Sequence, residues 1–164
     1  GQAKFRVMAQ PLLAADGKSV VLVDSNKGLQ RIDLSRPDPD LVADRMDEEL
    51  VHRQSQVSLS ADGKVIYQNS PTPANVLAFD SQTFLLRGTT APGVPIPSSD
   101  GAQLFVLDGN SNQLRVVDAK SFHLDAVYSV SGCGVGALVA WAPGFSAREL
   151  ILVRQDATCR LSIP

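Results

Sequence analysis

A short turn-and-strand motif occurs three times in the chain, and this repetition constrains the fold more than any other feature. The copies read AADGKSVVLVDSN (14–26), SADGKVIYQNS (60–70) and SSDGAQLFVLDGN (98–110). Their Asp-Gly pairs lie 46 and 38 residues apart. A period of about 40 residues is typical of repeat architectures, in which each copy forms one supersecondary unit.

Each Asp-Gly pair stands between two apolar, β-branched runs. This pattern predicts a β-hairpin, because glycine adopts the positive φ that tight hairpin turns require. Two further apolar runs follow every hairpin: LQRIDLS, NVLAFDS and QLRVVDA come first, then LVADRM, FLLRGTT and LDAVYSV. Each copy therefore predicts four strands.

A fourth, degenerate copy ends the sequence. ALVAWAP (137–143), ELILVRQ (149–155) and TCRLSI (158–163) predict three strands, so this unit is one strand short. The segment KFRVMA (4–9) predicts a spare strand ahead of the first copy. We expect 4–9 to pair beside 158–163 and close a ring, because closure removes exposed sheet edges.

These features predict an all-β protein, a β-propeller of four four-stranded blades closed by the N-terminal strand. The alternatives are part of a larger propeller of about seven blades and a β-sandwich of short strands. Within 36–54 the apolar spacing also suits a short helix, and we interpret 41–46 as a strand. The predicted single domain covers 1–164, with repeats at approximately 10–54, 55–92, 93–131, and 132–164 plus 4–9.

The third copy, VPIPSSDGAQLFVLDGNSNQLRVVDAKSFHLDAVYSV (94–130), resembles the repeat of the YVTN family of β-propellers. The shared order is a Ser-x-Asp-Gly turn, a Leu-Tyr-Val-like strand, a Gly-Ser-Asn turn and a VxVID-like strand. Residues 59–84 follow it more loosely. The resemblance implies a fold rather than an activity. Propellers of this kind include surface-layer and periplasmic binding proteins, lactonase-like enzymes and non-catalytic heavy subunits of amine dehydrogenases.

Composition excludes some partners. The net charge is −2, and the arginines form no basic stripe with interleaved aromatic residues, so we expect no nucleic-acid partner. No stretch approaches the ~18 apolar residues of a membrane span, so we expect no direct membrane insertion. The oligomeric state is not predicted.

The two cysteines, Cys133 and Cys159, are compatible with one disulfide or with two buried thiols. The repeat geometry favours the disulfide, because the glycines of GCGVGA (132–137) let the chain cross tightly between blades. A disulfide argues for an oxidising compartment, and we expect a periplasmic or extracellular location.

The sequence contains no catalytic or metal-binding constellation that we can identify. His52 and His123 are the only histidines and stand apart from any Cys/His cluster, which argues against a zinc site. DGNSNQ (108–113) lacks the glycine and glutamate of a calcium loop and predicts a turn. We therefore predict no catalytic residue, no metal and no cofactor.

A regular scaffold without such a constellation predicts a non-enzymatic module that binds another protein through irregular loops. The candidate loops are 70–75, 89–95 and the acidic linker 36–49. A lactonase-like enzyme, or a non-catalytic subunit of a periplasmic dehydrogenase, is the alternative. The predicted contact residues are Pro71, Pro73, Asn75, Pro92, Pro95, Asp38 and Asp40.

Overall fold

The computed structural model describes residues 11–14, 17–24, 28–35, 40–45, 56–71, 74–134, 138–144 and 146–164. These residues form β-strands and one short 3-10 helix. The elements are β1 (Leu12–Leu13), β2 (Ser19–Asp24), β3 (Gly28–Asp33), β4 (Asp40–Arg45), β5 (Val57–Leu59), β6 (Val65–Pro71), β7 (Ala74–Asp80), β8 (Leu86–Thr90), β9 (Val94–Pro97), β10 (Gln103–Asp108), β11 (Gln113–Asp118), β12 (Leu124–Ser129), η1 (Ser131–Cys133), β13 (Leu138–Pro143), β14 (Glu149–Arg154) and β15 (Thr158–Ser162).

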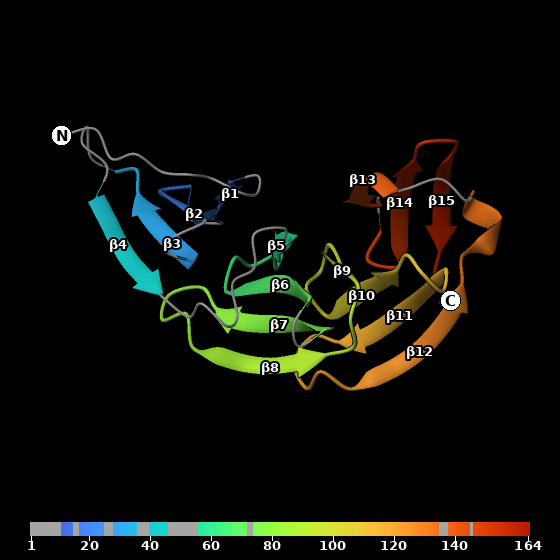
Figure 1. Cartoon of the computed structure of the whole chain (residues 1–164), viewed down its shortest axis with the longest axis horizontal. Helices are drawn as coiled ribbons and strands as arrows, with labels where there is room; N and C mark the ends of the chain where they lie inside the picture. The colour runs from blue at the N-terminus through green and yellow to red at the C-terminus, as the bar shows by residue number, and fades with distance from the viewer. Residues whose placement is uncertain are drawn as a thin grey trace.

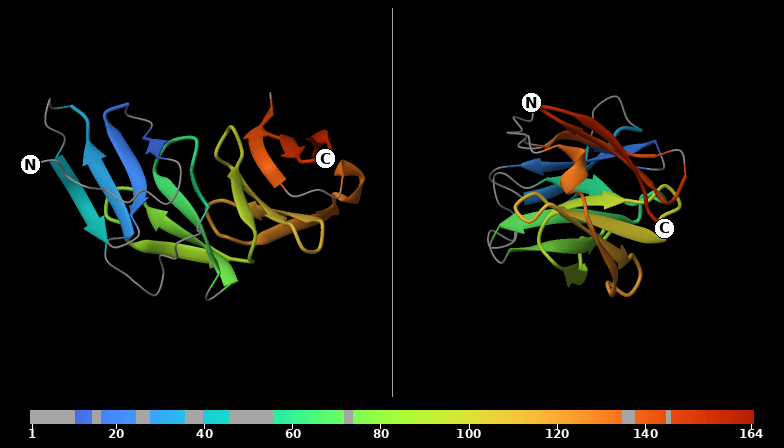
Figure 2. Two further views of the ribbon diagram at one scale, coloured as in Figure 1. Left: turned by 45° about the horizontal axis from the view of Figure 1, so that its top comes forward. Right: turned by 90° about the vertical axis from the view of Figure 1, so that its right-hand side faces the viewer.

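The strands form four antiparallel sheets in simple chain order: blade A is β1–β4, blade B is β5–β8, blade C is β9–β12 and blade D is β13–β15. The blades follow one another along an arc, with β5 and β9 on its concave side and β8 and β12 on its convex side (Figure 1). Blades A and D lie at its two ends, as Figure 2 also shows. The expected all-β architecture is confirmed. The expected closing strand 4–9 lies outside the described residues.

The structure also decides two local assignments. β4 (Asp40–Arg45) pairs with β3 along its length, so the strand interpretation of this segment is correct and the helical alternative is wrong. The fourth copy forms the three predicted strands, and β14 pairs with both β13 and β15. Among the described residues, blade D has no fourth strand.

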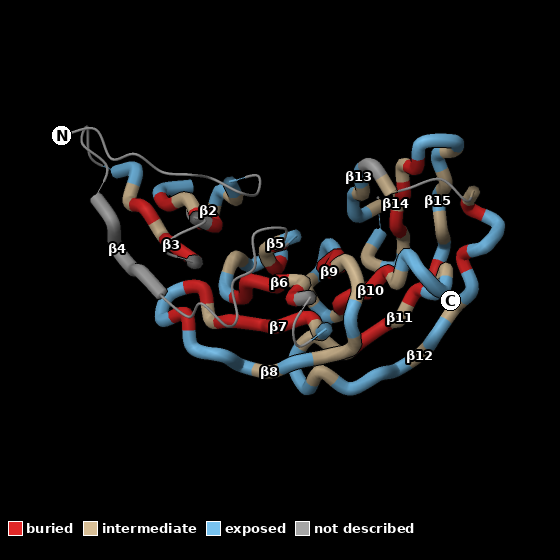
Figure 3. Tube along the Cα trace, in the orientation of Figure 1, coloured by how far each residue is buried: buried red, intermediate tan, exposed pale blue. Residues whose placement is uncertain are grey.

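Apolar clusters fill the seams between neighbouring blades. The second strands of blades B and C each contribute to the seams on both of their sides, because successive side chains of a strand point to opposite faces. In β10, Leu104 and Val106 face blade B, while Phe105 and Leu107 face blade D. All four side chains are fully buried. Figure 3 shows that the second and third strands of blades B and C, β6, β7, β10 and β11, are mostly buried. The outer strands β8 and β12 are largely exposed.

The Asp-Gly turns are built alike in blades B and C. In blade C, the Ser98 hydroxyl donates to Asp100 Oδ1 at 2.6 Å and accepts the Gln103 amide at 3.0 Å. Gly101 follows with φ 73°, a value that glycine adopts without strain. Ser60 and Asp62 make the same contacts in blade B. The repeated sequence therefore encodes a repeated hydrogen-bond network.

This network predicts loss of stability in acid. The hydroxyl of Ser98 holds the pKa of Asp100 below its ordinary 3.8, as the hydroxyl of Ser60 does for Asp62. A pKa lowered by folding contributes stability that is present above the ordinary value and is lost as the pH falls through the folded value. We expect the free energy of unfolding to hold above about pH 5 and to decline below about pH 4.

Chemical denaturation from pH 7 to pH 3 measures this decline. The variant D62N/D100N should show a shallower acid decline than the parent, because two of the contributing carboxylates are gone. An acid decline of the same slope in both proteins would contradict the assignment. Asp80 and Asp118, the last residues of β7 and β11, also have lowered pKa values. The variant should therefore keep part of the decline in stability.

Two phenylalanines pack on seams between blades, and each lies in the turn that follows the third strand of its blade. Phe84 and Phe122 adopt positive φ values of 55° and 59°, which are uncommon for bulky residues. Phe84 is buried in the seam between blades A and B. Phe122 packs against the seam between blades B and C and contacts Gly88 of β8 so closely that a Cβ there would overlap its ring. Each phenylalanine thus fastens its blade to the preceding one.

Candidate functional site

The antiparallel strand order divides the connections of the arc between two rims. One rim has the turns between first and second and between third and fourth strands, and we call it the Asp-Gly rim. The other has the turns between second and third strands and the blade-to-blade connections, and we call it the crossover rim. In blade C these are 98–102 and 119–123 on the Asp-Gly rim, and 109–112 and 130–134 on the crossover rim. A partner that contacts one face of the arc would contact one of these rims.

The predicted contact residues do not form one surface. Pro92 is exposed and lies in the connection between β8 and β9, on the crossover rim. Asn75 is half-buried near the start of β7, on the same rim, and pairs with Ser70. Asp40 begins β4 and therefore lies on the Asp-Gly rim.

Of the other four predicted contact residues, two lie in strands and two lie outside the described residues. Pro95 does not belong to a loop, because it lies inside β9, pairs with Val106 and is buried. β9 is the innermost strand of its sheet, and proline is tolerated in an edge strand because it lacks only an outward-facing N–H. Pro71 is the last residue of β6. Pro73 and Asp38 lie outside the described residues.

Pro92 is held in place by a charged network on the crossover rim. Arg115 donates to the Pro92 carbonyl at 3.1 Å and pairs with Asp108 at 3.2 Å. Asp108 also accepts the Ser111 hydroxyl at 2.6 Å, and this bond lowers the pKa of its carboxyl group. The predicted turn reading of 108–113 is confirmed, since β10 and β11 pair directly across it.

The disulfide lies on the same rim. Cys133 in η1 is bonded to Cys159 in β15, with a Cα–Cα distance of 5.3 Å. The expected disulfide is confirmed, and the alternative of two buried thiols is wrong. The bond joins the connection that enters blade D to the last strand of that blade, so it restrains the C-terminal end of the arc.

The concave side of the arc is formed by the first strands of the blades. Its strands read LL in β1, VSL in β5, VPIP in β9 and LVAWAP in β13, so among the described residues these strands contribute no ionisable side chain. The described residues also contain no group of three His, Cys, Asp or Glu side chains placed to hold a metal ion. His123 is exposed, and His52 lies outside the described residues.

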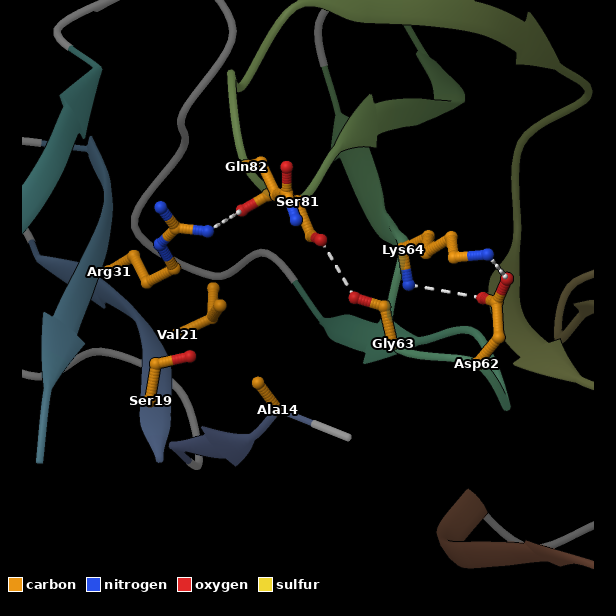
Figure 4. A pocket seen from close by; sticks show the side chains of 9 residues that line it. All are labelled: Ala14, Ser19, Val21, Arg31, Asp62, Gly63, Lys64, Ser81 and Gln82. Carbon is orange, nitrogen blue, oxygen red and sulfur yellow. Dashed lines mark hydrogen bonds and ion pairs between the residues drawn. The ribbon is translucent and has the colours of Figure 1, made fainter. Parts of the chain in front are cut away.

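A small polar pocket opens between blades A and B on the Asp-Gly rim (Figure 4). Arg31 of β3 donates to the Ser81 carbonyl at 3.4 Å across the seam. Ser81 donates its hydroxyl to the Gly63 carbonyl at 2.7 Å, so this hydroxyl has no base to activate it as a nucleophile. Lys64 also lines the pocket and pairs with Asp62 at 3.5 Å. The pocket offers charge and hydrogen bonds without a catalytic arrangement.

Sequence analysis missed this pocket, although a comparison of the repeats could have found it. Arg31 pairs with Val21 in blade A, and the equivalent partners are Ala78 in blade B and Val116 in blade C. Ala78 and Val116 are buried in seams. An arginine at a position that is apolar in blades B and C was the available signal.

No protein-family model matches the sequence, and no curated protein matches it at a significant level. Similar solved structures do exist, and they are β-propeller proteins. Hydrazine synthase of Kuenenia stuttgartiensis matches with a TM-score of 0.73 and 12% identity over 99% of this chain and 47% of that chain. BamB from Moraxella catarrhalis matches with a TM-score of 0.67 and 15% identity over 98% of this chain and 46% of that chain.

A 6-phosphogluconolactonase-like protein from Bacteroides fragilis matches with a TM-score of 0.57 and 19% identity over 71% of this chain and 36% of that chain. These likenesses confirm the propeller fold, which is all that similarity at this level of identity shows. The chain spans between a third and a half of the length of these three structures.

Proposed function

We propose that this chain is a non-enzymatic propeller module, built from YVTN-type repeats, that binds another protein in an extracytoplasmic complex. The observation that carries the proposal is the composition of the concave strands. Propeller sites form where side chains from several blades converge, and the described strands that face the concave side bring only apolar, proline and serine side chains there. A hydrolytic mechanism needs a general base or a nucleophile within reach of the substrate.

The pocket between blades A and B supports the same conclusion by its size. Its volume is about 160 Å³, whereas pockets for drug-sized ligands measure roughly 300–1,000 Å³. A cavity of this size accommodates one protruding side chain better than a metabolite. Arg31 in its wall donates to the Ser81 carbonyl of blade B, so the pocket belongs to the seam between the two blades.

The crossover rim offers an exposed loop whose backbone is held by a side chain. Pro92 is exposed there, and Arg115 fixes its carbonyl. Gly93, which follows at φ 150°, packs so close to the Leu107 carbonyl that a Cβ would overlap it. A loop fixed in this way loses little conformational entropy when a partner binds. We assign the partner contact to this rim.

The disulfide fits an oxidising compartment, and among the described residues no helix is both long and apolar enough to cross a bilayer. We propose a periplasmic or extracellular location. This location and the scaffold role agree with each other, because a partner held outside the cytoplasm requires a module that folds there.

Site-specific photocrosslinking tests the partner contact. A photoreactive residue at Pro92, in extract of the native source under oxidising conditions, should yield one discrete crosslinked species. The same residue at Leu124, which is exposed on the convex side, is the matched control and should yield none. Equal labelling at both positions, or none at Pro92, would count against the assigned rim.

A second measurement addresses the enzymatic alternative. The lactonase-like neighbour motivates an assay of the purified chain with a panel of sugar lactones. We expect hydrolysis at the uncatalysed rate. Hydrolysis above that rate which disappears in the variant R31A would overturn the non-enzymatic assignment and point to the pocket as a catalytic site.

A further inference from the structure

One face of blade D has no neighbouring blade in the described structure. In β14, Leu150 and Leu152 are fully buried against blade C, while Ile151 and Val153 point to the other face and are only half-buried. The flanking strands add exposed Ala140 and Ala142 from β13 and exposed Thr158, Arg160 and Ser162 from β15 to the same face. The second strands of blades B and C bury both of their faces. A run of four apolar residues is typical of a strand buried on both sides, so β14 has the sequence of a covered strand.

The repeats show what belongs on this face. In blades A, B and C the side of the second strand that faces the next blade includes Val21, Tyr67 and Phe105. Their cross-strand partners on the third strand are Arg31, Ala78 and Val116. The equivalent pair in blade D is Ile151 and Arg160. Each of the other three positions is covered by the blade that follows.

Blade D matches blade A most closely at these positions. Both carry two aliphatic residues on the second strand and an arginine on the third: Val21, Val23 and Arg31 in blade A, and Ile151, Val153 and Arg160 in blade D. Arg31 reaches across to the Ser81 carbonyl of blade B. Arg160 has a 58% exposed side chain and pairs with Glu149 of its own sheet.

We propose that this face, Ala140, Glu149, Ile151, Val153 and Arg160, is an unfilled blade seam, and that its occupant is a fifth propeller blade of blade B's pattern. Such a blade would present apolar residues from its second strand to Ile151 and Val153. It would present a turn carbonyl to Arg160, as blade B does to Arg31. The solved propellers support this, because the chain spans only 47% and 46% of two of them.

The small area of the face argues against a second copy of the chain as the occupant. Three strands of about five residues cover on the order of 250 Å² per side, given a strand spacing of ~4.8 Å and a rise of ~3.3 Å per residue. Two such faces bury roughly 500 Å², whereas specific interfaces bury at least about 1,000 Å². A blade linked through the chain is held at a high effective concentration and does not need that area.

The direct test adds a copy of blade B to the end of the chain. A copy of residues 83–92, whose strand returns the chain to the crossover rim, followed by a second copy of residues 56–92, is attached after Pro164. Thermal unfolding of the extended and parent chains is then compared. We expect a single transition with Tm higher by about 5 °C. I151K should leave the parent nearly unchanged and lower the Tm of the extended chain. V127K, at a half-exposed site on the outer strand of blade C, is the control and should affect both equally.

A measurement on the parent alone covers the case in which the added blade does not fold. The open face should bind an apolar fluorescent dye, and I151K/V153K should reduce the dye fluorescence several-fold, while V127K should not. Equal fluorescence in the parent and in I151K/V153K would overturn the proposal. A stable dimer in the parent that I151K/V153K dissociates would replace the fifth blade with a second copy. A folded fifth blade without any coupling to Ile151 would also refute it.

Discussion

F105A is expected to lower the free energy of unfolding by about 3–5 kcal/mol. Phe105 is fully buried in β10 and packs in the seam between blades C and D beside Leu150 and Leu152. Its removal takes away apolar contact and leaves a cavity that two rigid sheets cannot easily close. Because the ring belongs to the seam rather than to one sheet, blade D should lose protection from hydrogen exchange before blade B does.

V127A is the matched control in the same blade. Val127 lies in the outer strand β12 and is 47% exposed, so truncation should change the free energy of unfolding by about 0.5 kcal/mol or less. Denaturant titration of both variants at pH 7 measures the difference. Similar losses in F105A and V127A would show that the seam does not carry the stability assigned to it.

Loss of the Cys133–Cys159 disulfide should lower the free energy of unfolding by about 3 kcal/mol in the chain-entropy estimate. The bond closes a loop with a sequence separation of 26 residues and so restricts the unfolded chain. In the folded state it joins blade D, which has only three strands in the described structure, to its entering connection. We expect blade D to be the first part of the molecule to open after reduction.

The double variant C133A/C159A provides the control for this experiment. Reductant should destabilise the parent and leave the double variant unchanged, and intact mass should show the parent two hydrogens heavier after reduction. An unfolding midpoint of the parent that is the same with and without reductant would contradict the predicted stabilisation by the disulfide.

Local features of the fold were predictable from sequence. The Ser-x-Asp-Gly turns were recognisable because their geometry depends on neighbouring residues alone: a hydroxyl, a carboxylate and a glycine within a few positions, as in Ser98, Asp100 and Gly101. Alternation of apolar residues gave the strands between the turns. The disulfide was predictable as a pair but not as a certainty, since its formation depends on how β15 is placed relative to η1.

The candidate site was predicted less well, for a physical reason that Pro95 and Arg31 illustrate. A proline in an irregular segment reads as a loop residue, yet Pro95 lies in an innermost strand and is buried. Arg31 reads as a surface charge, yet it bridges two blades. Both outcomes depend on which edge of a sheet a strand occupies and on what packs against it, and neither is a property of the local sequence.

The repeating four-strand unit, its turns and the all-β class could be predicted from sequence, because they follow from contacts between residues close in the chain. The rim that each loop occupies, the place of Arg31 in a seam and the blade face without a described neighbour became evident in the folded structure. These depend on packing between sheets that are separated by tens of residues. Ile151 and Val153 belong to an apolar run of the kind found in buried strands and are nevertheless only half-buried. Blade D lies at the end of the arc (Figure 1), and among the described residues no further blade packs on its outer face.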